Sequence, residues 1–515
     1  MVDGVAGDGA GWLDGGGSFR DPAGKGVRLS TLFPKCRFVA CDDIVAHGCH
    51  DDPEACRPGD LFVARLDDHS DGHELAARAI ARGVAGIVSE RIIPTFGTPL
   101  CIVPDTAWAH ARLHHALSGD PAGEMTVIAV TGTSGKTTTA WLAAAVLSEA
   151  GHRVGVLSDL GCLDADSAEP EPARIERPAV FASWLARLAA SGCSHVVVEV
   201  SSEMLATHAL AGVKCDSVVV TNLASAHLDR HGTVEAYHEI KSRILDCLGV
   251  DGCLVANVDD AGVRRLLARH RRNIGKKTPR ARDAGGAITV GLRGPADLSA
   301  SAVDRSLGGQ TFLLRHAGDA AAVGVGTPVS SFVRDALFAV AIGIRQGLPL
   351  EIASRGIEAA GSVPGRLDRI RRGQEAHVFV DQPTSGHALA STLASLRRLT
   401  PGRLVVLTEE AWAERLGGRR FANRAARWCN DCLIVPEGLL DRSAGSRQLA
   451  AYARIDRLLT GLGSRDCVLL IGSGLTHRPN PGDPGEPQVP LAVLVDAWLE
   501  MAHPATWPGA GRRAA

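Results

Sequence analysis

A glycine-rich turn followed by lysine and threonine is the strongest chemical signal in the chain. Residues 127–140 read VIAVTGTSGKTTTA: an apolar run, a turn, and an alanine-containing stretch typical of a helix. In such a turn Gly132 and Gly135 let backbone N–H groups converge on phosphate oxygens, and the helix N-terminus adds partial positive charge. Lys136 can neutralise the β- and γ-phosphates, and the Thr137 hydroxyl suits Mg²⁺. The predicted nucleotide-binding residues of this short phosphate loop are Gly132, Thr133, Ser134, Gly135, Lys136, Thr137 and Thr138.

Two further polar residues follow apolar runs that we interpret as strands. Glu199 lies at the end of the run 195–200, and His227 follows the run 217–221. In a parallel sheet both residues would lie beyond the carboxyl ends of their strands, where α/β proteins bind ligands. We therefore expect them at the same sheet edge as the phosphate loop.

Lys241 occupies an unusual place in a predicted helix over residues 233–245. It shares an apolar stripe with Val234, Tyr237 and Leu245. Burial there would lower the pKa of the lysine, and a neutral amine near Mg²⁺ can react with CO₂ to give a carboxylate-like carbamate. The alternative is a lysine whose stem covers the stripe while its ammonium reaches water. The helix pattern alone favours this second interpretation.

Composition narrows the class of protein. The 515 residues carry a formal net charge of −2 and 4% aromatic residues, which argues against a nucleic-acid binder. No apolar run reaches the roughly 18 residues of a membrane span, and the N-terminus does not resemble a signal peptide. The 13 scattered cysteines indicate reduced thiols in a cytoplasmic protein. Cys429 and Cys432 form a C-x-x-C pair without a second pair, so we interpret them as structural.

The length predicts about three domains. Strands alternating with helices indicate an α/β protein, with a central P-loop parallel-sheet ATPase domain and a Rossmann-like C-terminal domain. Short glycine-punctuated strands at 285–327 suggest a small antiparallel excursion. The expected divisions are a disordered glycine-rich tail at 1–27, a substrate-binding domain at 28–106, the central domain at 107–361, a C-terminal domain at 362–500 and a tail at 501–515.

Four segments within residues 127–245 together resemble the Mur ligase family, most closely its MurE-type, tripeptide-forming branch. They are VTGTSGKTTTA, VVVEVSSEML, TNLASAHLDRHGT and EAYHEIKSRIL. Weaker similarity extends over nearly the whole chain. It includes the N-terminal UDP-binding segment at 57–64, the start of the C-terminal domain at 362–366, and Val380-Asp381.

The resemblance implies a mechanism in which ATP converts a substrate carboxylate to an acyl phosphate, which an amine then attacks to form an amide. It implies one Mg²⁺ on Thr137 and Glu199, and a second on Glu199, His227 and a carbamylated Lys241. The implied partners are a UDP-muramoyl-peptide-like substrate and an amino acid, with no nucleic acid or membrane, for a cytoplasmic monomer. The implied catalytic residues are Lys136, Glu199, His227 and Lys241, and further cofactor-binding residues are Arg366 and Asp381.

Both substrate pockets depart from the family pattern. The changed positions are Asp52-Pro-Glu54, Glu176-Arg-Pro178, Glu203, Ala226, residues 380–387, residues 408–415 and residues 472–474. The D-N-P-R motif that holds the incoming amino acid in the family is absent, and Arg442 is displaced from its place. Two interpretations stay open: a ligase with an altered acceptor or amino acid, or a degenerate ligase that binds ATP and acts as a regulatory module. The intact ATP and metal residues favour the enzyme, and we expect it to reject diaminopimelate and lysine.

Overall fold

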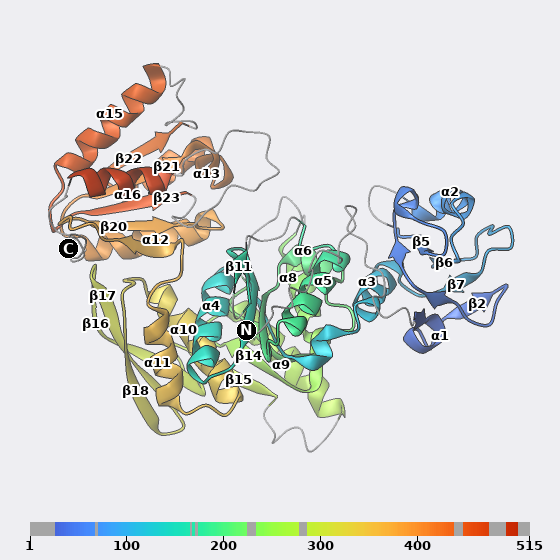
Figure 1. Ribbon diagram of the computed structural model, residues 1–515. Helices are drawn as coiled ribbons and strands as arrows, with labels where there is room; N and C mark the ends of the chain where they lie inside the picture. Colours follow the sequence, from blue (N-terminus) through green and yellow to red (C-terminus); the bar gives the residue numbers. More distant parts are fainter. Residues whose placement is uncertain are drawn as a thin grey trace, which may run out of the picture.

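The structure is a computed structural model that describes residues 26–66, 71–164, 167–169, 174–223, 233–277, 286–436, 446–472 and 491–502. It consists of three lobes, each built on its own sheet (Figure 1). Most of the two predicted tails lies outside the described residues. Among the described residues, no helix is long and apolar enough to cross a bilayer.

The first lobe is a five-stranded sheet in the order β2-β7-β6-β5-β4. Strands β4 to β7 run parallel, and β2 pairs antiparallel with β7. Its strands are β2 (Arg37–Val39), β4 (Cys49–His50), β5 (Leu61–Val63), β6 (Gly86–Ser89) and β7 (Leu100–Ile102), beside the pair β1 (Val27–Arg28) and β3 (Val45–Ala46). Its helices are α1 (Leu29–Leu32), α2 (Ala76–Ala81) and α3 (Thr106–Leu117). Through Ala109, Leu113 and Leu117, α3 packs into the core of this lobe.

The central lobe is an eleven-stranded sheet in the order β11-β10-β9-β12-β8-β13-β14-β15-β16-β17-β18. The strands from β9 to β16 in this order are parallel, and both ends of the sheet are antiparallel. The strands are β8 (Thr126–Thr131), β9 (Val154–Ser158), β10 (Gly161–Leu163), β11 (Ala168–Glu169), β12 (His195–Glu199), β13 (Cys215–Val220), β14 (Leu248–Asn257), β15 (Ala287–Gly291), β16 (Leu298–Ser306), β17 (Gly309–His316) and β18 (Asp319–Val325).

Helices cover both faces of the central sheet, because alternate residues of its buried strands point to opposite sides. Ile128 and Val130 of β8 pack with α4, α10 and α11, while Val127 and Ala129 pack on the side of α5, α6 and α9. The helices are α4 (Lys136–Glu149), α5 (Pro178–Ala190), α6 (Ser202–Ala206), α8 (Val234–Ser242), α9 (Ala261–Lys277), α10 (Ser330–Arg345) and α11 (Leu350–Ala360).

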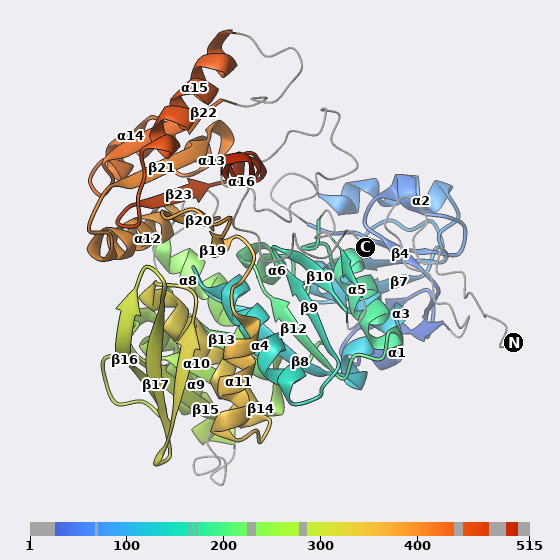
Figure 2. The same cartoon turned by 60° about the vertical axis from the view of Figure 1, so that its left-hand side comes forward.

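The third lobe is a five-stranded sheet in the order β19-β20-β23-β21-β22, parallel except for β19. In Figure 2 this sheet lies above the central lobe, on the side of α4 and α8, and its strands β19 and β20 are nearest to that lobe. Its elements are β19 (Arg366–Ile370), β20 (His377–Asp381), α12 (Gly386–Leu399), β21 (Leu404–Glu409), α13 (Glu410–Arg415), α14 (Arg419–Ala425), β22 (Asp431–Val435), α15 (Ser446–Thr460), β23 (Cys467–Ile471) and α16 (Leu491–Ala502).

The structure confirms the predicted α/β class, with a central parallel sheet and a largely parallel C-terminal sheet. The antiparallel excursion is present as β16, β17 and β18. The predicted helix at 233–245 is α8 as far as Ser242, and a 3₁₀ turn continues it to Cys247. The domain limits at 27/28, 106/107, 361/362 and 500/501 stay predictions.

Candidate active site

The phosphate loop joins β8 to α4 through two glycines that no other residue could replace without strain. Gly132 has a φ of 148°, and a Cβ there would lie 2.0 Å from Oγ1 of Thr221. Gly135 has a φ of 83°, and its Cβ would lie 2.4 Å from Oδ1 of Asp335. Positive φ and close approach both require glycine, so the loop shape follows from the sequence. It leaves the first N–H groups of α4 pointing away from the helix, free to meet an anion.

Lys136 and Glu199 form the charged centre of the site. The Lys136 ammonium lies 3.4 Å from Oε1 of Glu199, and their side chains are 12% and 2% exposed. Burial is the largest single effect and favours the neutral form of each group. Their mutual attraction, together with Asp159 beside Lys136 and Arg366 beside Glu199, outweighs it, so the pKa of Lys136 is raised and that of Glu199 is lowered. Both groups are therefore charged at neutral pH. Oε1 of Glu199 lacks a hydrogen-bond partner among the described residues.

Asp159 and Arg366 flank this pair. The backbone N–H of Asp159 donates to Oε2 of Glu199 at 3.2 Å, and burial and the nearby Glu199 carboxylate raise the pKa of the Asp159 carboxyl to about 6. The Arg366 guanidinium, at the start of the third lobe, donates to Oγ1 of Thr137 at 3.1 Å and to the backbone carbonyl of Gln382. One side chain thus connects the phosphate loop to the third lobe.

Lys241 lies on the buried side of α8. Its ammonium is enclosed, with the residue 2% exposed, and donates to Oγ1 of Thr131 at 3.1 Å. The Tyr237 ring lies 5.6 Å from it, and the Tyr237 hydroxyl meets Oγ1 of Thr133 at 3.3 Å. Burial and then the positive charge of Lys136 lower the pKa of Lys241 to about 7. The interpretation in which the ammonium reaches water is therefore wrong. The side chain of Val234, the first member of the predicted stripe, lies outside the described residues.

Each member of the Lys136–Glu199 pair lines a different cavity. One, of about 270 Å³, is lined by the phosphate loop and by Asp335, Arg366 and Asp381. The other, also of about 270 Å³, is lined by Glu199 together with Asp159, Glu176, Ser201 and Glu203. The ion pair of Lys136 and Glu199 therefore connects a cavity that suits nucleotide phosphates with a second, polar cavity.

The structure brings most of the predicted site residues to one place. The phosphate loop from Ser134 to Thr138 shares the first cavity with Arg366 and Asp381, and Lys136 connects it to Glu199. Burial raises the pKa of Asp381 to about 6, although Arg366 opposes this. His227, the predicted metal ligand, lies outside the described residues, as do Ala226 and Arg442.

Sequence reasoning missed three residues of the site. Asn222 accepts from the N–H of Ser134 at 3.1 Å and donates to its carbonyl at 2.8 Å, which holds the loop in shape. Asp335 fills the space under Gly135, and Asp159 contacts Glu199. Asp159 directly follows β9 and Asn222 lies two residues after the end of β13, and this position beyond a parallel strand was the available signal.

The fold and these cavities define a P-loop nucleotide-binding protein. A sequence profile of the Mur ligase middle domain matches residues 130–343. The UDP-N-acetylmuramyl-tripeptide synthetase of Roseiflexus sp. is 31% identical over 422 residues, which cover 78% of this chain and 81% of the relative. The 2,6-diaminopimelate ligase of Chlorobaculum tepidum is 30% identical over 452 residues, covering 82% and 86%. The chain belongs to the Mur ligase family, whose members are ATP-dependent amide-forming ligases.

Solved structures support the same fold. A UDP-N-acetylmuramoyl-L-alanyl-D-glutamate–2,6-diaminopimelate ligase superposes with a TM-score of 0.65 at 22% identity, covering 87% of this chain and 93% of that one. The MurF ligase of Thermotoga maritima, solved with ADP, gives 0.52 at 18% identity, covering 88% and 98%. Both are multi-lobed ligases. The comparisons thus favour the enzyme over the alternative of a degenerate regulatory module.

The donor set fits Mg²⁺, the ion that Mur ligases use with ATP. Thr137 supplies a hydroxyl and Glu199 a carboxylate, and oxygen is the ligand that this hard cation prefers. Oε1 of Glu199 is paired with the Lys136 ammonium 3.4 Å away, so it would become available to a cation once nucleotide phosphates pair with Lys136.

Proposed function

We propose that this ligase joins an amino acid to the terminal carboxylate of a UDP-muramoyl-peptide-like substrate in peptidoglycan precursor synthesis. The observation that carries the proposal is the ion pair of Lys136, which lines the first cavity, with Glu199, which lines the second. A carboxylate held in the second cavity would face the γ-phosphate held in the first. We further propose that the chain acts as a monomer in the cytoplasm, where ATP and nucleotide-linked precursors occur together.

The reaction needs two bond exchanges. An acceptor carboxylate oxygen attacks the γ-phosphorus, the bond to the ADP oxygen breaks, and an acyl phosphate forms. The amine then attacks the acyl carbon, phosphate leaves with the bonding pair, and the amine loses a proton as the amide forms. The Lys136 ammonium stabilises the negative charge on the phosphoryl group during its transfer, and Arg366 reaches the same cavity from the third lobe.

Mg²⁺ on Thr137 and Glu199 would offset negative charge on the phosphates. The second proposed ion has Glu199, His227 and a carbamylated Lys241 as ligands. The support for the carbamate is an enclosed, amine-bearing side chain close to Lys136. Its neutral nitrogen would add to the carbon of CO₂ and release one proton, which leaves a negatively charged carbamate in place of the neutral amine.

The altered third-lobe segments lead us to propose an amine other than diaminopimelate or lysine. The relatives that carry diaminopimelate in their names share only about 30% identity with this chain. A site built for a charged partner that has lost its counter-charge discriminates against that partner by several kcal/mol. Residues 437–445, where Arg442 lies, are outside the described structure.

One experiment tests both parts. The protein is incubated with ATP, Mg²⁺ and UDP-muramoyl dipeptide, together with each of a panel of amino acids, and the products are identified by mass spectrometry. We expect one amide product and ADP, absent with Lys136→Ala, and little product from diaminopimelate. Efficient formation of the diaminopimelate tripeptide would refute the altered amine. ATP hydrolysis without any amide over the whole panel would refute the ligase.

A further inference from the structure

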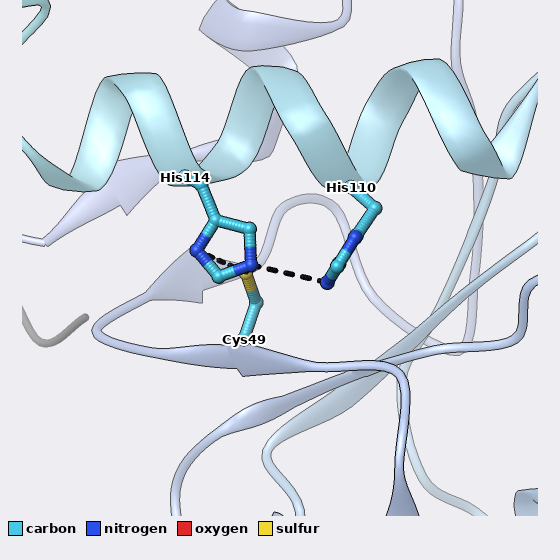
Figure 3. Close-up of side chains that lie close together, drawn as sticks. All are labelled: Cys49, His110 and His114. Atoms are coloured by element: carbon cyan, nitrogen blue, oxygen red, sulfur yellow. Dashed lines mark hydrogen bonds between the residues drawn. The ribbon is translucent and has the colours of Figure 1, made fainter. Parts of the chain in front are cut away.

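The first lobe contains a buried group of side chains that the ligase reaction does not use. Cys49 lies on β4, while His110 and His114 lie one turn apart on α3. Residues four apart on a helix share a face, so both imidazoles point toward the strand. Figure 3 shows the His114 ring against the Cys49 sulfur, with His110 directed into the same space. The ligand atoms of the three side chains all lie within 4.8 Å of one another.

The separations match the edges of a metal coordination shell. Nε2 of His110 and Nε2 of His114 are 3.1 Å apart, and Sγ of Cys49 is 3.6 Å from Nε2 of His114. With zinc bonds of about 2.0–2.1 Å to nitrogen and about 2.3 Å to sulfur, tetrahedral angles put two nitrogens about 3.3 Å apart and nitrogen and sulfur about 3.6 Å apart. Sγ of Cys49 also lies 3.9 Å from Nδ1 of His114, so the His114 ring would have to turn to direct its Nε2 at a shared ion.

The histidines are in the protonation state that a metal requires. Cys49, His110 and His114 are 0%, 5% and 2% exposed. Burial lowers the pKa of His110 to about 4 and that of His114 well below its usual range, so both rings are neutral at pH 7. No described group hydrogen-bonds Nδ1 of His110, so nothing prevents its Nε2 from presenting a lone pair to the cluster.

Two carboxylates lie near the cluster. Burial first, and then the negative charges of Asp51 and Asp60, raise the pKa of the Cys49 thiol. The positive charge of Arg65 opposes a cation, but Arg65 is paired with Asp51 at 2.7 Å. Binding would follow Cys–SH + M²⁺ → Cys–S–M⁺ + H⁺, so one thiol proton is released and no redox partner is needed.

We propose that Cys49, His110 and His114 bind a borderline transition-metal ion of the Zn²⁺ class, with a water molecule as the fourth ligand. One thiolate and two imidazoles are a zinc-type donor set, unlike the oxygen-rich set proposed for Mg²⁺. The ion would fasten β4 to α3. On the next position of α3, His115 meets the carbonyl of Ala209 in the central lobe at 2.7 Å. The site would therefore stiffen the helix that connects the first two lobes.

The test uses the full chain, stripped of metal with a chelator and then saturated with ATP and Mg²⁺. It is dialysed against Zn²⁺, and bound zinc is measured by mass spectrometry. Co²⁺ serves as a second probe, because thiolate ligation gives a charge-transfer band that oxygen ligands do not. We expect one strongly held ion per chain, a cobalt–thiolate band, and an apparent Tm that rises with Zn²⁺.

Cys49→Ala and His110→Gln should each abolish the strongly held zinc and the thiolate band. Cys429→Ser, in the C-x-x-C pair of the third lobe, and His115→Gln, one position beyond His114, should retain both. Circular dichroism establishes that each variant is folded, and His110→Gln covers the case in which Cys49→Ala does not fold. Equal zinc content in the wild type and a folded His110→Gln variant, or a cobalt spectrum without the thiolate band, would overturn the site.

Discussion

Replacing Lys136 by alanine should weaken both ATP binding and the folded protein. Without the ammonium, nucleotide loses a charge-assisted contact of about 1.5–3 kcal/mol, which corresponds to about 10- to 150-fold in Kd. In the free protein the change leaves Glu199 buried, with 2% of its side chain exposed and its partner gone. The Glu199 carboxylate can avoid remaining a buried, unpaired charge by taking up a proton. From its ordinary pKa of 4.5, this costs about 3 kcal/mol at pH 7, which limits the loss of stability.

Calorimetry with ATP and Mg²⁺ measures the first effect, and thermal melting measures the second. Glu199→Gln added to Lys136→Ala should restore part of the apparent Tm, because no buried carboxylate is left, but it should not restore ATP affinity. Lys214→Ala removes an exposed lysine of the same lobe and serves as the matched control. An unchanged Kd for Lys136→Ala would show that the loop does not hold the phosphates as we infer. An unchanged Tm would show that the pair with Glu199 is unimportant.

Three further predictions follow from the same site. Arg366→Lys keeps the positive charge but loses the planar guanidinium that donates to both Thr137 and Gln382. We expect kcat to fall about tenfold while the protein stays folded. An unchanged kcat would contradict the role of Arg366 in connecting the lobes. Labelled bicarbonate should give a carbamate carbon signal in the wild type and none in Lys241→Ala; identical spectra would mean an ordinary lysine. Burial, opposed by Arg334 and Arg366, raises the pKa of Asp335 to about 8 from 3.8, so the native state holds a proton that the unfolded chain releases between those pH values. The stability that this group contributes is present below about pH 4 and is lost as the pH rises to 8. The Tm of Asp335→Asn, compared with that of the wild type, should therefore increase as the pH rises through this range. A difference in Tm that does not change with pH would contradict the raised pKa.

The parts of the site set by local sequence were predictable. The order of apolar run, glycines and Lys-Thr specifies β8, the loop and α4, because positive φ values and helix formation are local properties. The stripe on α8 placed Lys241 on an apolar face, but the pattern alone favoured an ammonium that reaches water, and the burial of Lys241 shows that this interpretation is wrong. Thr131, the partner of Lys241, lies 110 positions earlier, and no local pattern connects the two.

Contacts between distant segments could not be predicted from one sequence. Asn222 is 88 positions from Ser134, and Arg366 is 229 positions from Thr137. Cys49 lies in a strand of only two residues, too short for any periodicity to reveal. The H-x-x-x-H spacing of His110 and His114 is a usable signal for a metal site, but no local pattern connects these histidines to Cys49.

The charged groups at the centre of the ligase can change partners when ligands bind, so that no buried charge is left without an opposite charge. In the free protein Lys136 is balanced by Glu199, and its positive charge helps to keep Lys241 neutral. When phosphate oxygens pair with the Lys136 ammonium, the Glu199 carboxylate loses its partner. Mg²⁺ is the cation that we propose as the new partner of Glu199. A negative carbamate on Lys241 would become favourable at the same moment, because a cation then lies nearby. Nucleotide, metal and carbamate should therefore bind cooperatively, and the free protein should carry less carbamate than the protein saturated with ATP and Mg²⁺.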